Sequence, residues 1–127
     1  METAKAKLSN YRQAPRKVRL VADLLRGMSA ERALAQLAML PKRASEPMQK
    51  LLRSALANAT EREGVSAADL YVSKIEVNGG VVFKRSMPRA RGRASMIKKR
   101  TSHITLSLAQ KGKPKTQAPN SKAEAAK

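Results

Sequence analysis

Apolar residues recur at helical spacing through the first half of the chain. Between Ala14 and Gly27 they repeat at steps of three and four residues, which is the pattern of a helix with one buried face. Pro15 suits a first helical turn and Gly27 a C-terminal stop. The positions predicted to be buried are Val18, Val21, Ala22 and Leu25. The helix also has an arginine face, formed by Arg12, Arg16, Arg19 and Arg26.

Two further helices are predicted before Gly64. Ser29 can cap a helix from Ala30 to Leu40, which Pro41 closes. Its predicted apolar positions are Leu34, Leu37 and Ala38. A third helix begins near Ser45 and keeps helical spacing for about three turns. Its apolar positions are Met48, Leu51, Leu52, Ala55, Leu56 and Ala59. Three short amphipathic helices need a surface to bury against.

Strand patterns in the second half supply that surface. His103 to Leu108 alternates polar and apolar residues, and Leu70 to Val77 is rich in β-forming residues. Ala4 to Leu8 alternates small apolar and basic residues, as an edge strand can. The sequence therefore predicts an α+β fold, with three helices packed on a small antiparallel three-stranded sheet and a long protruding β-hairpin.

The hairpin joins the last two strands. If Ile75 and Val77 pair near Leu108, its midpoint falls in the basic stretch, close to Gly92. Its distal half then projects by roughly 40 Å, at ~3.3 Å per residue. A two-stranded ribbon alone is marginal in water, so we expect its tip to be mobile or held by a partner. The predicted parts are a globular α+β body (1–83 and 103–110), an extended basic hairpin arm (84–102) and a disordered basic tail (111–127).

The net charge of the chain indicates which classes of partner it can bind. The chain has 27 Lys and Arg against 9 Asp and Glu, a formal net charge of +18. Because like charges repel, such an excess favours a polyanionic partner, with nucleic acid the first candidate and an anionic membrane surface the second. No cysteine is present, and no apolar run approaches the roughly 20 residues of a membrane span. The N-terminal stretch lacks the apolar core of a secretory signal, so we expect a cytoplasmic protein.

The sequence shows no group of residues that would indicate catalysis. His103 is the only histidine, and we interpret it as a strand residue that is hydrogen-bonded or faces a phosphate. The carboxylates form no close cluster that reads as a metal site. Gly79 and Gly80 resemble a turn or bulge, not a phosphate-binding loop. The sequence therefore predicts no enzyme, no metal site and no cofactor.

The basic residues carry the candidate chemistry. The stretch from Lys84 to Arg100 has eight Lys and Arg and no acid, and arginines predominate towards its tip, which favours forked contacts to phosphate. The arginine face of the first helix is a second patch, so we expect a two-point grip on phosphates. Aromatic residues are too few for a base-stacking platform. Recognition of the shape and backbone of a folded RNA, or of DNA, is left. The candidate nucleic-acid-binding residues, which are RNA-binding if the partner is a folded RNA, are Arg12, Arg16, Lys17, Arg19, Arg26, Lys84, Arg85, Arg89, Arg91, Arg93, Lys98, Lys99, Arg100 and His103.

Three stretches carry a resemblance to a known family. "RQAPRKVRLVADLLRG", "ALANA" and "KRSMPRARGRASMIKKRTSHITL", in this order, closely resemble the bacterial-type large-subunit ribosomal protein L-twenty-two family, and the hairpin string with its "KRTSHI" exit is the most specific. The similarity runs from about Lys7 to Leu108. The tail from Lys111 departs from the shorter family pattern, so no family role is carried over to it.

The resemblance implies a structural constituent of the large ribosomal subunit that binds large-subunit (23S-type) ribosomal RNA and takes part in early assembly. It implies a body near the outer opening of the peptide exit tunnel and a hairpin tip that lines the tunnel wall. There it would meet nascent peptides transiently and affect macrolide susceptibility. The tunnel-facing tip would be Pro88, Arg89, Ala90, Arg91, Gly92 and Arg93. Its other partners would be neighbouring large-subunit proteins, with the chain a monomer within the ribosome and no membrane contact.

Two alternatives come from other classes. An architectural DNA-binding protein also uses a basic β-arm with a proline near its tip, but it relies on dimerisation through an apolar interface. In this chain the apolar faces of the three predicted helices are all needed to cover one sheet, which leaves none for such an interface. A basic nuclease would need an acidic metal cluster, which the sequence does not show.

Overall fold

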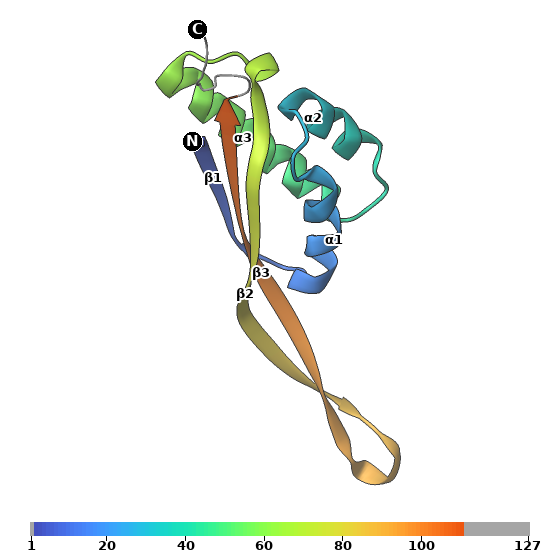
Figure 1. Ribbon diagram of the computed structural model, residues 1–127. Coiled ribbons are helices and arrows are strands. Elements are labelled where there is room, and N and C mark those ends of the chain that lie inside the picture. The colour runs from blue at the N-terminus through green and yellow to red at the C-terminus, as the bar shows by residue number, and fades with distance from the viewer. Residues whose placement is uncertain (1, 111–127) are drawn as a thin grey trace, which may run out of the picture.

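The structure, a computed structural model, describes residues 2–110, so the predicted tail lies outside the described residues. A β-strand, three helices and two long strands follow one another, with a short 3-10 turn before and after the first long strand (Figure 1). The elements in chain order are β1 (Glu2–Tyr11), α1 (Pro15–Leu25), α2 (Ala30–Met39), α3 (Ser45–Glu63), η1 (Ala67–Asp69), β2 (Leu70–Pro88), η2 (Ala90–Gly92) and β3 (Ala94–Gln110).

The strands form one antiparallel sheet in the order β1-β3-β2, and the three helices lie along one side of it (Figure 1). Because β3 is central, its alternate residues Ile104, Leu106 and Leu108 are fully buried in the core. They are joined there by Leu25, Met48 and Leu52 from the helices. The predicted α+β class, with three helices on a three-stranded sheet, is confirmed.

The helices begin and end where the local chemistry indicates. Pro15 occupies the first turn of α1, whose buried residues are the four predicted ones. The Ser29 hydroxyl accepts a hydrogen bond from the backbone N–H of Arg32 and caps α2. Gly64 ends α3 in the left-handed conformation, with φ of 66°. The prediction for Ala38 was wrong: it is exposed, because α2 turns Ala30, Ala33 and Leu37 to the core.

The long hairpin is present, but its predicted register was wrong. Val77 pairs with Ile104 and Ile75 with Leu106, not with Leu108. The turn is centred on Arg91, which adopts a left-handed φ of 61° together with Gly92 at 70°. The centre therefore lies about one residue earlier than the midpoint predicted near Gly92, and each residue of shift at the turn changes the pairing by two.

Beyond the body, β2 and β3 continue as a two-stranded ribbon that leaves the sheet and ends in the η2 turn (Figure 1). The ladder runs without a break from the Val82–Arg100 pair to the Pro88–Ala94 pair. Beyond the Val82–Arg100 pair no helix packs on the hairpin (Figure 1), and none of the residues 82–100 is buried. The helices and the sheet thus serve to anchor one exposed ribbon at its base.

Candidate nucleic-acid interface

A β-bulge marks the root, defined here as residues 79–82 of β2 together with residues 100–103 of β3. Gly79 pairs with Ser102 but Val82 pairs with Arg100, so β2 carries one extra residue at this point. The Thr101 hydroxyl donates a hydrogen bond of 2.7 Å to the carbonyl oxygen of Val81 and is almost fully buried. The bulge predicted from the two glycines is therefore present, where the ribbon leaves the body.

Gly80 is held by close packing and not by an unusual backbone angle. A Cβ atom added to it would lie 2.5 Å from the Thr101 Oγ1 and 3.0 Å from the His103 Nε2. Neither neighbour can move freely, since the Thr101 hydroxyl is bonded and buried and the His103 ring is hydrogen-bonded. The absence of a side chain lets the two strands and the imidazole approach one another.

His103 belongs to the root and not to the ribbon. Its Nδ1 accepts a hydrogen bond of 3.1 Å from the backbone N–H of Asn10, a residue with a left-handed φ of 57°. Its Nε2 faces the backbone of Gly80. The sequence interpretation of a hydrogen-bonded strand histidine is consistent with this geometry, because one ring nitrogen is already engaged within the protein.

The predicted arginine face of the first helix divides into two groups, and only Arg16 and Arg19 lie within α1 itself. Arg19 donates from Nε and Nη2 to the carbonyl oxygen of Val77, at 3.3 and 3.0 Å. Arg26 donates from Nη2 to the carbonyl oxygen of Ile75 at 2.9 Å, and its Nη1 pairs with Asp23. These two arginines satisfy carbonyls on the open edge of β2 and hold α1 beside it. Their charge stays at the surface, but part of their hydrogen-bonding capacity is used by the fold.

Arg12 and Arg16 are the freer pair. The Arg12 guanidinium lies over the ring of Phe83, 4.6 Å from its centroid, which orients the planar group at the side of the ribbon without using its N–H donors. Arg16 is exposed at the start of α1 and makes no hydrogen bond or ion pair with another residue of the 2–110 region. Lys17 lies three residues before Leu20, on a different side of α1 from Arg19.

Arginines from two elements meet in a cleft at the root. The cavity has a volume of about 380 Å³, and no carboxylate of the 2–110 region lines it. It is lined by Ala14, Pro15, Arg16, Arg19, Gly79 and Arg100. Arg100 comes from the first ladder pair of the ribbon and, like Arg16, bonds to no other described side chain. We call this site the arginine cleft. Its size and positive charge fit an anionic group such as a phosphate, bound by forked guanidinium contacts.

The ribbon places like charges opposite one another. Lys84 pairs directly with Lys98, and the next pair towards the body sets Lys99 opposite Phe83. Facing cations repel across an antiparallel pair, so this arrangement opposes the hairpin when the protein is alone. Glu76 is the last acid before Glu124, so no carboxylate on the ribbon offsets the repulsion.

Apolar residues accompany these cations, which sequence reasoning missed. Alternation places Phe83, Met87 and Ile97 on one face of the ribbon, because Arg85 pairs with Ile97 and Met87 with Ser95. Phe83 and Met87 are exposed, at 37% and 40%. The spacing of the apolar residues in the two strands could have revealed this face only with the correct register.

At the tip, backbone contacts close a small loop. The N–H of Arg89 donates to the carbonyl of Arg93 at 2.6 Å, and the Arg89 Nε donates to the Ser95 hydroxyl at 2.9 Å. Arg91 sits at the turn in its left-handed conformation. All six predicted tip residues, 88–93, are exposed. The loop therefore displays three guanidinium groups around a turn with no anionic side chain.

Other kinds of site find no support in the described region. Residues 2–110 contain no group of three or more His, Asp or Glu side chains that could hold a metal ion. Within the same range, no helix is long and apolar enough to cross a membrane. The cationic surfaces of the root and ribbon remain the strongest candidate interface.

Comparison with known proteins finds one family whose model matches most of the chain. The family model described as "Ribosomal protein L22p/L17e" matches residues 6–109. The protein named "Large ribosomal subunit protein uL22" from Lactobacillus helveticus is 49% identical over 111 residues, which cover 87% of this chain and 95% of that protein. Its namesake from Pelobacter propionicus is 54% identical over 104 residues, covering 81% and 93%. A third, from Geobacter sulfurreducens, is 53% identical over 109 residues, covering 85% and 97%.

Proposed function

This chain belongs to the ribosomal protein L-twenty-two family of the large ribosomal subunit, and we propose that it binds large-subunit ribosomal RNA through two connected surfaces. The first is the arginine cleft at the root, and the second is the cationic ribbon beyond it. As a member of this family the chain is a structural ribosomal protein and not an enzyme.

The observation that carries the RNA-binding proposal is the Lys84–Lys98 pair within a ribbon that has no carboxylate. A free protein gains nothing from facing lysines, whereas a phosphate between them converts the repulsion into two attractions. The formal net charge of +18 extends the same argument to the whole chain. A polyanion that surrounds the ribbon on both faces fits this arrangement better than a flat membrane surface does.

We further propose that two parts of the chain, a body and an arm, have different roles. Residues 1–83 and 103–110 form the body, and residues 84–102 form the arm that reaches into folded RNA. The last two residues of this range, Thr101 and Ser102, are buried at the root and anchor it. Such an arm carries its charge to a fixed depth inside the RNA, which supports a role in early subunit assembly.

The tip, residues 88–93, is proposed to line the peptide exit tunnel and to meet nascent peptides transiently. Support comes from its exposure, its lack of acids and the closed loop that Arg89 and Arg93 form. A photoreactive residue at Ala90 tests this in translating ribosomes, because Ala90 is exposed and bears no charge. We expect adducts with nascent chains from position 90. Their absence, while the same residue forms adducts with RNA, would contradict the contact with nascent peptide.

The RNA-binding proposal is tested by the salt dependence of binding. We expect Lys98→Ala or Arg100→Ala in the full chain to reduce the slope of log affinity against log salt by about one for each phosphate that the variant no longer binds. The probe is a transcript of large-subunit ribosomal RNA. Lys42→Ala is the matched control, since Lys42 is exposed on the connection before α3 and belongs to neither the root nor the ribbon. Equal slopes for the unaltered chain and all three variants would remove the ribbon and the cleft from the binding surface.

The architectural DNA-binding alternative predicts a different outcome. We expect the chain to sediment as a monomer and to prefer structured ribosomal RNA over duplex DNA. A dimer that bends DNA would overturn the RNA proposal. The helices support the monomer, because the buried faces of α1, α2 and α3 are already covered within one chain.

A further inference from the structure

Helix α1 has a second apolar side that the core does not use. Leu20 and Leu24 are 60% and 46% exposed, and a spacing of four residues places them on the same side of the helix. They lie away from the buried stripe of Val18, Val21 and Leu25. An amphipathic helix at the surface usually turns a polar side to water. Two neighbouring leucines there form an apolar strip that no residue between positions 2 and 110 covers.

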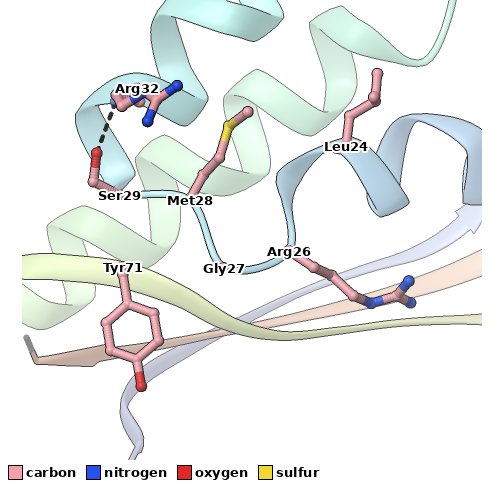
Figure 2. Close-up of a pocket in the computed structure, with 7 residues that line it drawn as sticks. All are labelled: Leu24, Arg26, Gly27, Met28, Ser29, Arg32 and Tyr71. Atoms are coloured by element: carbon pink, nitrogen blue, oxygen red, sulfur yellow. Dashed lines mark hydrogen bonds between the residues drawn. The ribbon is translucent and has the colours of Figure 1, made fainter.

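A groove continues the strip at the C-terminal end of α1. It has a volume of about 630 Å³ and is lined by Leu24, Arg26, Gly27, Met28, Ser29, Arg32 and Tyr71 (Figure 2). Figure 2 shows Leu24, Met28 and Arg32 rising on one side of the connection between α1 and α2, whereas Tyr71 projects from β2 on the other side. Because the side chains do not converge, the groove is no enclosed pocket for a small molecule. It is an open surface.

The backbone of the groove is firmly held. The N–H of Gly27 donates to the carbonyl of Val72 at 2.9 Å, and the N–H of Val72 donates to the carbonyl of Met28 at 2.8 Å. Gly27 makes this possible with a φ of 80°, a left-handed angle that glycine adopts without strain. The connection is therefore an added backbone partner for the edge of β2. A surface fixed in this way needs little ordering before it binds a partner.

Charge in the groove is of one sign. Among the residues that the structure describes, its lining contains two arginines and no carboxylate. Arg26 is engaged with Asp23 and with the carbonyl of Ile75, but the exposed Arg32 guanidinium pairs with no other residue between positions 2 and 110. Arginine and methionine beside apolar side chains are typical of the centres of protein interfaces. The complementary partner presents an aliphatic side chain next to a carboxylate.

We propose that Leu20, Leu24 and Met28, with Arg32 beside them, form a docking surface for a second protein of the large ribosomal subunit. This inference rests on the proposed function, because it takes the subunit as the setting. RNA is the poorer occupant, because the exposed side chains of Leu20 and Leu24 offer a phosphate no hydrogen-bond donor, and the Tyr71 ring projects on the other side of the connection (Figure 2). A second copy of this chain is equally unsuited, since each copy carries a net charge of +18.

The test uses the full chain assembled into purified large subunits. A photoreactive benzoylphenylalanine replaces Leu24, and irradiation is followed by mass spectrometry of the adducts. We expect one protein of the subunit to be joined to position 24, through a peptide that contains Asp or Glu. The matched control carries the same group at Met39, which is 84% exposed at the other end of α2 from Arg32. Adducts with RNA alone, or no protein adduct above the Met39 control, would overturn the proposal.

A charge reversal tests the chemistry of the partner. Arg32→Glu is expected to lower the yield of the protein adduct at position 24 about tenfold, a change equivalent to about 1.4 kcal/mol. Arg53→Glu makes the same charge change on an exposed position of α3 and should leave the yield unchanged. Equal yields in the two variants would overturn the predicted carboxylate. RNA binding of the unaltered chain is measured in parallel. If the unaltered chain does not bind RNA, the proposed function is contradicted. If it binds RNA but position 24 gives no protein adduct, only the docking surface is overturned.

Discussion

Strands β2 and β3 are paired along almost their whole length, but the two halves of this ladder lie in different surroundings. In the body half, Ile75 pairs with Leu106 and both are buried beneath the helices. In the ribbon half, Lys84 pairs with Lys98 and both are exposed. Antiparallel pairing is common to both halves. The comparison teaches that hydrogen-bonded pairing alone supplies a shape, while burial on one face supplies the stability.

The largest expected difference between the halves is in amide hydrogen exchange. We expect body amides such as those of Leu106 and Leu108 to exchange only on global unfolding, about 5 kcal/mol or more above the native state, and amides of residues 84–100 to exchange at little cost. Exchange followed by NMR on the free chain measures this directly. Strong protection of the ribbon without RNA would show that the two halves are equally stable and would contradict the comparison.

Removing a side chain should destabilise the protein in the body half of the ladder far more than in the ribbon half. Leu106→Ala deletes a fully buried side chain at the centre of the core, so we expect it to lower the free energy of unfolding by about 2–5 kcal/mol. Met96→Ala is the matched change on the ribbon, where Met96 is 59% exposed, and should alter it by less than about 0.5 kcal/mol. Urea denaturation measures both values. Comparable losses would mean that the ribbon contributes to the core.

The root can be broken by one methyl group. Gly80→Ala places a Cβ 2.5 Å from the Thr101 Oγ1, so we expect a loss of about 1–3 kcal/mol in the free energy of unfolding and weaker RNA binding. Gly79→Ala is the neighbouring control for stability alone, because the nearest atom to its Cβ would be the Pro15 Cγ at 3.9 Å but Gly79 lines the arginine cleft. Thermal unfolding of both variants and RNA titration of Gly80→Ala check this. If the two variants are equally stable, close packing at Gly80 does not determine the structure of the root.

The smallest effect concerns the facing lysines. Lys98→Glu turns the repulsive pair with Lys84 into an attractive one, so we expect the free ribbon to gain about 0.2–1 kcal/mol of local stability while RNA binding weakens. Lys99→Glu makes the same charge change opposite Phe83 and should weaken RNA binding without that gain. Amide exchange of the ribbon separates the variants. A ribbon that becomes less protected in Lys98→Glu would refute the repulsion argument.

Much of the body could be predicted from local pattern. The buried residues of α1 and the cap at Ser29 follow from spacing and residue type over one or two turns. Ala38 failed because alanine is compatible with either side of a helix, and only the packing of its neighbours decides which side is buried. The register of the hairpin failed because it depends on the φ of Arg91, and a non-glycine residue gives no local sign of a left-handed angle.

The sequence predicted which basic residues make up the candidate interface. It did not predict which of them bond within the protein. Sequence spacing placed Arg12, Arg16, Arg19 and Arg26 on one face of the first predicted helix, whereas α1 spans Pro15–Leu25 and leaves Arg12 and Arg26 outside it. It could not show that Arg19 bonds to a carbonyl 58 positions away, or that Arg12 lies over Phe83. Long-range partners of this kind are set by the tertiary fold. Charge alone therefore identifies the surface and overstates how many of its cations are free for a ligand.

The bulge at Gly80 has a mechanical consequence. The ribbon from Val82 to the turn at Arg91 extends about 30 Å at ~3.3 Å per residue, so it acts as a lever whose fulcrum is the root. A change of about 10° at the fulcrum sweeps the tip through about 5 Å over that length. The Thr101 hydroxyl on Val81 and the space where a methyl group is missing thus determine where a distant loop points. The direction of the ribbon is therefore determined at the root, about 30 Å from the tip residues that would contact a partner.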